Sequence, residues 1–231
     1  MPGLPEHSSD TAARILAAAS DLLLRRGERA VTIAEVAQRA KVGKGTVYLY
    51  WASRTDLIFG LIARDFLALA EEFTRKFSAD PDLARPSRLF PELLRTAPGR
   101  PFVRAVLLED EDLLGVLAAD PRSKAITDAL GPEKLMMAVL PSWRAGSLAS
   151  DDWTLEDQAY AVLAVFRGFL FSHELGADGD PQVDTPEIFG RSMAAVLGEK
   201  RAAPGEVTAA SETIIRYLEE GTDLVLSKIA S

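Results

Sequence analysis

The sequence predicts an all-α protein, and three observations support this fold class. Apolar residues recur at the three-and-four spacing of helices along most of the chain, and no run shows the alternation typical of strands. Two short helical patterns near the N-terminus are separated by three residues, which is the spacing of a helix-turn-helix. The 231 residues, 48% of them hydrophobic, suffice for a small domain joined to a larger one.

The first helix is predicted to start at Ser9 or Asp10, either of which can cap it. Its apolar face consists of Ala12, Ile15, Leu16, Ala19, Leu22 and Leu23. Arg25 and Arg26 precede Gly27 at the other end, where cations stabilise the negative pole of the helix dipole and glycine adopts the left-handed conformation.

A second, short helix is predicted to follow Thr32. Thr32 and Glu35 match the S/T-x-x-E capping box, and Val31 and Val36 can form the hydrophobic staple around the cap. The start of this helix is therefore marked by two independent local signals.

The sequence KVG at positions 41–43 interrupts the pattern before KGTVYLYW at positions 44–51 resumes it. In a helix-turn-helix the first helix lies across the DNA backbone and the second enters the major groove. Ser53, with Asp56 three residues later, can cap a further helix that runs through about Phe77.

The octet KGTVYLYW carries several groups suited to DNA. Lys44 and Gly45 open the helix, where backbone N–H groups and the helix dipole favour an anion. Thr46 can donate to a phosphate or pack its methyl group on thymine, and Tyr48 and Tyr50 carry hydroxyls on rigid apolar rings.

Ordinary core packing is the alternative for each residue of the octet. We prefer it for Val47 and Trp51, and we prefer DNA contact for Lys44, Thr46 and Tyr50.

Residues 10–66, above all TIAEVAQRAKVGKGTVYLYWASRTDLI, resemble the N-terminal domain of the TetR family of bacterial transcriptional repressors. The resemblance implies an all-helical homodimer with a divergent C-terminal domain that binds small molecules. It also implies operator contacts from the start of the second helix, from the third helix and from the start of the fourth. The matching positions are Thr32, Lys44, Gly45, Thr46, Tyr48, Leu49, Tyr50 and Arg54.

Three departures from the family pattern stand out. Lys41 occupies the turn position where the family usually has glycine, and a left-handed lysine there would cost on the order of 1 kcal/mol. Gly43 replaces the common serine cap, a weaker but acceptable choice. Trp51 and Arg54 stand in for the usual Phe and Lys, and arginine retains the ability to anchor a phosphate.

The net charge of −8 is unevenly distributed. Residues 1–56, here called the head, carry eight Lys or Arg against six Asp or Glu, whereas residues 57–231, here called the body, carry eighteen against twenty-eight. We expect the head to be the DNA-binding domain, because the local surface and not the total charge governs phosphate binding. By the resemblance, the body is the helical ligand-binding and dimerisation domain.

Composition excludes several classes of chemistry. The chain has no cysteine, hence no disulfide, thiolate zinc site or cysteine nucleophile, and His7 and His173 are too far apart for a metal motif. We expect neither a metal nor a cofactor. The sequence shows no apolar run long enough to span a membrane and no signal peptide, so we expect a cytoplasmic protein that does not bind membranes.

Five further helices are predicted in the body, over residues 102–118, 123–139, 155–175, 186–200 and 206–229. The proline-rich stretch 80–101 is interpreted as a connecting region, and residues 176–185 are interpreted as a long loop.

Three aromatic residues of the body are candidates for the lining of a ligand pocket. Phe102, Trp143 and Phe166 can line an apolar cavity, although aromatic residues in helical bundles are more often simple core. The acidic run at 109–112 points around a helix and is interpreted as a solvated face. His173 is interpreted as a core or interface residue.

The helix over residues 155–175 is apolar nearly all round and needs cover on two sides. A second subunit can supply one of them, so Val162, Val165 and Phe169 are candidates for a dimer interface, together with Leu218 of the last helix. Ordinary core remains the alternative for each.

Together these expectations describe a repressor that binds a palindromic operator as a homodimer and is released by a small, largely apolar effector. The alternative is an all-helical enzyme or small-molecule carrier with a docking helix-turn-helix. We favour a protein that is not an enzyme, because the sequence offers no nucleophile motif, histidine-centred dyad or phosphate loop. Activation of transcription, or response to another protein, stays open.

Overall fold

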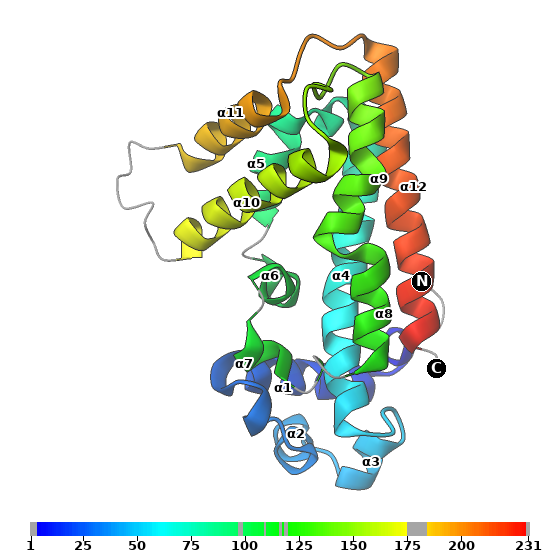
Figure 1. Ribbon diagram of the computed structural model, residues 1–231. Coiled ribbons are helices and arrows are strands. Elements are labelled where there is room, and N and C mark those ends of the chain that lie inside the picture. Colours follow the sequence, from blue (N-terminus) through cyan, green and yellow to red (C-terminus); the bar gives the residue numbers. More distant parts are fainter. Residues whose placement is uncertain are drawn as a thin grey trace. The chain divides into compact units, whose positions relative to one another are not determined.

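The computed structural model describes residues 4–96, 99–108, 110–115, 117, 120–174 and 184–229. Within these ranges the chain forms α-helices and short 3-10 helices and contains no strand, so the all-α prediction is confirmed (Figure 1). The loop expected over 176–185 lies, up to residue 183, outside the described residues. A search of the described helices finds none with the length and apolar character that a bilayer crossing requires.

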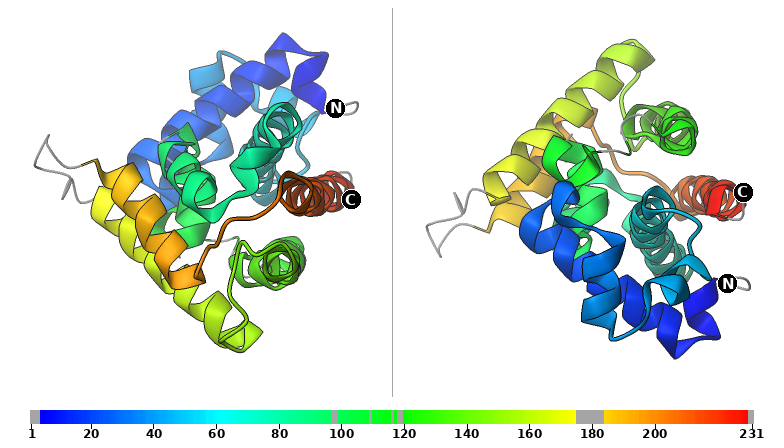
Figure 2. Two further views of the ribbon diagram at one scale, coloured as in Figure 1. Left: turned by 90° about the horizontal axis from the view of Figure 1, so that it is seen from above. Right: turned by 90° about the horizontal axis from the view of Figure 1, so that it is seen from below.

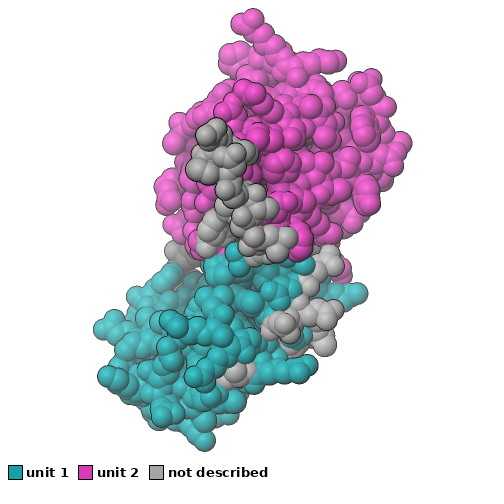
Figure 3. Space-filling view, turned by 90° about the vertical axis from the view of Figure 1, so that its left-hand side faces the viewer, with its two compact units in different colours: residues 1–66, 101–125, 225–231 teal, residues 67–100, 126–224 magenta. Residues whose placement is uncertain are grey.

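The chain divides into two compact units (Figure 3). Unit 1 comprises residues 1–66, 101–125 and 225–231, and unit 2 comprises residues 67–100 and 126–224. The helix α4 (Arg54–Ala79) runs without a break past residue 56, and the boundary between head and body at that point stays a prediction.

The first helix of unit 1, α1 (Asp10–Arg26), has the bounds that its caps indicated. The Ser9 hydroxyl accepts a hydrogen bond from the backbone N–H of Ala12, and Gly27 has a φ of 73°, which a glycine adopts without the steric penalty of a side chain.

The helix-turn-helix consists of α2 (Ile33–Ala40) and α3 (Lys44–Tyr48). The Thr32 hydroxyl accepts the N–H of Glu35 at 3.2 Å and donates to its carboxylate at 3.0 Å, so the predicted cap is present. The backbone of Lys41 is left-handed, with φ 56° and ψ 47°, as expected for a residue at the turn position where the family usually has glycine. The helix α3 is shorter than predicted, although the N–H of Trp51 still bonds to the carbonyl of Val47 beyond its end.

The later part of unit 1 corrects the predicted helix over 102–118. It forms α6 (Pro101–Leu108) and the short α7 (Glu111–Leu114). The Asp110 carboxylate accepts the N–H of Leu113 and so caps a new helix where continuation was expected. At the other end of α6, the Asp65 carboxylate accepts the N–H groups of Phe102 and Val103.

Unit 2 corrects two further expectations. The region 80–101 is more than a connection, because it contains α5 (Pro86–Thr96), which packs extensively against α11 (Thr185–Leu197). The single helix expected over 123–139 is α8 (Pro121–Leu130) followed by α9 (Pro132–Ala145). Pro132 starts the new helix, since proline has no N–H to continue the previous one.

Two more helices complete unit 2, α10 (Leu155–Glu174) and most of α12 (Pro204–Ile229), and Figure 2 shows α10 and α11 side by side. The core of the unit is aromatic. The ring of Phe90 lies 6.1 Å from Trp143, 6.1 Å from Phe166 and 5.7 Å from Phe189, measured between centroids. Gly190 allows α11 to approach α5 closely, because a Cβ atom there would lie 2.5 Å from the carbonyl oxygen of Ser87.

Candidate nucleic-acid interface

The segment formed by α3 and the three residues after it divides its side chains between core and solvent. Val47 is fully buried and Trp51 is 6% exposed, so both are core residues as predicted. Tyr48 is 53% exposed and Leu49 is 81% exposed, which is unusual for large apolar side chains. This apolar surface is therefore in contact with water, and a binding partner could bury it.

The charges around α3 also favour an anionic partner. Lys41 and Lys44 are exposed at the turn and at the helix start, and neither forms an ion pair with a carboxylate in the part of the chain that the structure describes. Four arginines elsewhere in the head do form ion pairs: Arg25, Arg26, Arg39 and Arg54. Lys41 and Lys44 thus place unpaired positive charge where α3 begins.

Tyr50 has a bond that sequence reasoning missed. Its hydroxyl lies 2.7 Å from the Ser9 hydroxyl, which also accepts the N–H of Ala12 at the start of α1. This bond ties the end of the α3 segment to the first helix and positions the Tyr50 ring. A contact between residues 41 positions apart cannot be predicted from a local sequence pattern. A direct contact between Tyr50 and DNA stays a prediction.

Arg54 is also engaged inside the domain. Its guanidinium donates to the carbonyl oxygens of Val31 and Glu28 and pairs with the Glu28 carboxylate. These bonds fix the start of α4 against η2 (Glu28–Ala30). Thr32 is exposed, but its hydroxyl serves the cap of α2. For both residues, DNA contact stays a prediction.

The family model for bacterial regulatory proteins of the tetR family matches residues 15–61, which contain this helix-turn-helix. This match identifies the helix-turn-helix domain as similar to the DNA-binding domain of the tetR family.

A curated relative supports the assignment. The chain is 50% identical over 44 residues to an uncharacterized HTH-type transcriptional regulator, YdeS, from Bacillus subtilis strain 168. The matched stretch is 19% of this chain and only 22% of the relative, so this chain matches about a fifth of the length of that regulator.

Solved structures extend the likeness to the fold of the body. A transcriptional regulator FadR from Bacillus subtilis, in complex with stearoyl-CoA, has a TM-score of 0.56 at 15% identity, covering 82% of this chain and 99% of that one. A putative transcriptional regulator, SCO4942 from Streptomyces coelicolor, has a TM-score of 0.57 at 20% identity, covering 83% and 100%. At such identities the comparison shows the fold alone.

The predicted pocket residues belong to two different units. Phe102 belongs to unit 1, whereas Trp143 and Phe166 belong to unit 2. Trp143 is fully buried and its indole N–H donates to the carbonyl oxygen of Ala84 at 3.0 Å. Trp143 and Phe166 are both buried in the core of unit 2, and contact with a ligand stays a prediction for them.

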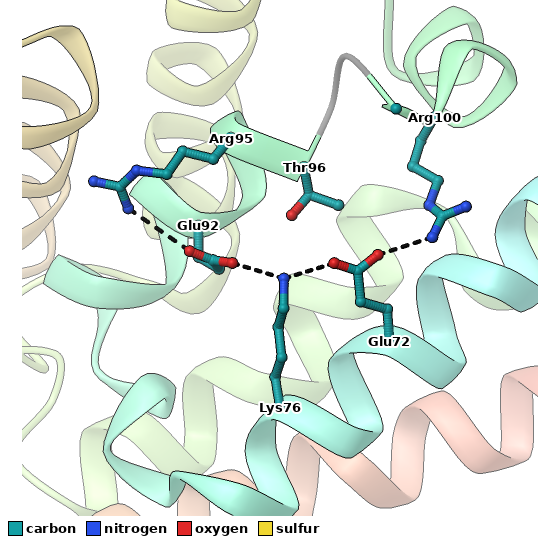
Figure 4. Close-up of a pocket in the computed structure, with 7 residues that line it drawn as sticks. Glu72, Lys76, Glu92, Arg95, Thr96 and Arg100 are labelled. Atoms are coloured by element: carbon teal, nitrogen blue, oxygen red, sulfur yellow. Dashed lines mark hydrogen bonds and ion pairs between the residues drawn. The ribbon is translucent and has the colours of Figure 1, made fainter.

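A cavity of about 370 Å³ opens elsewhere in unit 2 and is ionic (Figure 4). Lys76 lies between the carboxylates of Glu72 and Glu92, 2.6 Å from each, and Arg100 lies 2.8 Å from Glu72. Hydrogen bonds from Lys76 and Arg100 lower the pKa of Glu72 below its ordinary value. Thr96 points into the cavity from α5 (Figure 4). This network joins α4 to α5 and does not match the apolar lining that was expected.

The proposed dimer residues all belong to unit 2. Val162 is fully buried in the protomer, and its place in a dimer interface stays a prediction. Val165 and Leu218 are half-buried, and the ring of Phe169 stacks on Phe189 at 4.5 Å.

The face of α10 that solvent reaches is a different one. Its exposed residues follow helical spacing: Tyr160, Ala164, Arg167, Gly168 and Phe171. Tyr160 is 78% exposed and Phe171 is 55% exposed, and a Cβ atom built on Gly168 would meet nothing within 4 Å. This apolar face has no cover within the described part of the protomer.

Among the described side chains, no group of three or more His, Asp or Glu is placed to hold a metal ion. The side chains of His173 and of the acidic residues Glu109, Glu111 and Asp112 lie outside the described set, so their interpretations stay predictions.

Proposed function

We propose that this protein is a TetR-family transcriptional repressor that binds a palindromic operator as a homodimer and releases it when a small effector binds. The observation that carries the DNA part is the two-sided α3 segment. Val47 and Trp51 anchor it in the core, whereas Tyr48 and Leu49 stay exposed beside the unpaired Lys44. An exposed apolar surface next to unpaired cations is better suited to contact with the major groove of DNA than to contact with water.

In this proposal each α3 enters one major groove of a two-fold symmetric site, because a symmetric dimer places two equal heads on the DNA. Lys44 and the N–H groups near Gly45 hold phosphate, while Thr46, Tyr48 and Leu49 face the base edges. The remaining proposed contacts are Thr32, Tyr50 and Arg54.

The homodimer is supported by the uncovered face of α10. Tyr160 and Phe171 are large apolar residues on a helix that has solvent on this side, and a second copy of the chain would bury them. Tyr160→Glu combined with Phe171→Glu should convert the dimer to a monomer in sedimentation experiments. The control Ala17→Glu adds charge to the exposed side of α1 and should leave the dimer intact.

Residues 57–231 supply effector binding in this proposal. A largely apolar effector would suit a body whose core is aromatic. Complete reversal of occupancy from 1:99 to 99:1 needs about 5.5 kcal/mol of differential affinity, whereas allosteric coupling is typically about 1–3 kcal/mol. We therefore expect partial release of DNA. Stearoyl-CoA, present in the solved FadR structure, is a convenient first probe for release, with free coenzyme A as its control.

The DNA claim is tested by selecting duplexes from a random-sequence library with the full-length protein. The proposal expects an inverted repeat among the retained sequences and a binding constant that weakens steeply with salt. Lys44→Gln should weaken binding to the selected duplex, whereas Lys124→Gln, an exposed change on α8, should not. Retention of random sequences without an inverted repeat would refute the dimeric operator.

A further inference from the structure

Arg122, at the start of α8, makes three contacts within unit 1. Its guanidinium lies 2.8 Å from the carboxylate of Asp120, which caps the same helix, and 2.8 Å from the carboxylate of Asp56 in α4. Its Cζ atom also lies 4.3 Å from the centre of the Phe59 ring. Two of the three contacts join α8 to the first turns of α4.

The Asp56 carboxylate is part of the cap that begins α4. One of its oxygens accepts the Ser53 hydroxyl at 2.7 Å, and the Ser53 oxygen accepts the N–H of Asp56 at 3.0 Å. The other oxygen accepts Arg122. This cap follows Trp51, the core residue that holds the α3 segment, by two residues. A shift of Asp56 therefore reaches the recognition helix over a short stretch of chain.

The three contacts act together because the guanidinium is largely shielded. The Arg122 side chain is 22% exposed, Phe59 is 3% exposed and Asp120 is 8% exposed. Charge-assisted hydrogen bonds and cation–π contacts are stronger in such surroundings than at an open surface. Removing the guanidinium would leave two carboxylates without the cation they share, so the loss includes new repulsion.

We propose that Arg122 is a positioning residue for DNA binding, which holds the start of α4 and thereby the orientation of α3. The DNA part of this inference rests on the proposed function.

The first test needs no DNA. Hydrogen–deuterium exchange of the full-length chain is compared between the wild type, Arg122→Gln and the control Lys124→Gln. Arg122→Gln should speed exchange of the amides at residues 54–59 by about 10-fold while those of α1 stay unchanged, whereas Lys124→Gln should have no effect. Unchanged exchange at residues 54–59, or an equal rise throughout the chain, would overturn the proposal. Arg122→Lys keeps the charge without the planar fork and should give an intermediate rate.

The second test is a double-mutant cycle with Asp56→Asn on the selected duplex. Each single change should weaken DNA binding by about 10-fold, and the double variant should bind no more weakly than either single variant, since both remove the same contact. Losses that multiply, or wild-type affinity in Arg122→Gln, would refute the assignment. If the wild type retains no duplex at all, the proposed function fails, and the exchange measurement still decides whether Arg122 holds α4.

Discussion

Replacing Leu49, the residue that follows α3, by alanine separates DNA binding from folding. The side chain is 81% exposed in the free protein, so its removal costs the fold almost nothing. Full burial against DNA would be worth ~2 kcal/mol for the carbons removed, at ~0.8 kcal/mol per carbon. If the groove covers about half of that surface, the loss is ~1 kcal/mol, or roughly 5-fold in binding constant.

Fluorescence anisotropy with the selected duplex measures the affinity, and urea denaturation measures the free energy of unfolding. Val47→Ala is the matched change on the buried side of the same segment, and it should lower that free energy by about 1–3 kcal/mol because Val47 is fully buried. The reasoning is refuted if Leu49→Ala destabilises the fold as Val47→Ala does, or if it leaves the affinity unchanged.

Three further predictions concern the fold. Lys41→Gly should raise the free energy of unfolding by roughly 0.5–1 kcal/mol, because it relieves the left-handed backbone at the cost of a more flexible unfolded chain; a lower urea midpoint would contradict this. Gly190→Ala should destabilise the protein by about 1–3 kcal/mol, seen as a lower melting temperature, since its Cβ would meet the Ser87 carbonyl oxygen. The lowered pKa of Glu72 stabilises the fold above the ordinary value of 4.5, and this contribution is lost as the pH falls through the lower folded value. Urea midpoints below pH 4.5 should therefore fall more steeply for the wild type than for Glu72→Gln, and parallel curves would argue against the network.

The head was predictable because its determinants are local. The Thr32–Glu35 and Ser53–Asp56 caps each span three residues, and the periodicity of α1 is visible in the sequence itself. The bonds that orient the head are distant in sequence. Tyr50 forms a hydrogen bond with Ser9, 41 residues earlier, and neither helical periodicity nor a capping motif predicts such a pair.

The body was harder to predict because tertiary packing outweighed local signals. Proline-rich residues 80–101 were interpreted as a connection, yet α5 forms with Pro91 inside it. A proline removes one helical hydrogen bond, and the close packing of α5 on α11 at Gly190 compensates for that loss. Trp143 was a pocket candidate, but the acceptor for its indole N–H lies 59 residues away at Ala84.

The most direct test of the central claim is a hydroxyl-radical footprint of the full-length protein on the duplex that it selects. We predict two protected stretches related by two-fold symmetry and separated by a whole number of helical turns, at about 10–10.5 base pairs per turn, with protection lost in Lys44→Gln. A single protected stretch would contradict the dimeric operator. A footprint that Lys44→Gln leaves unchanged would contradict the role of α3.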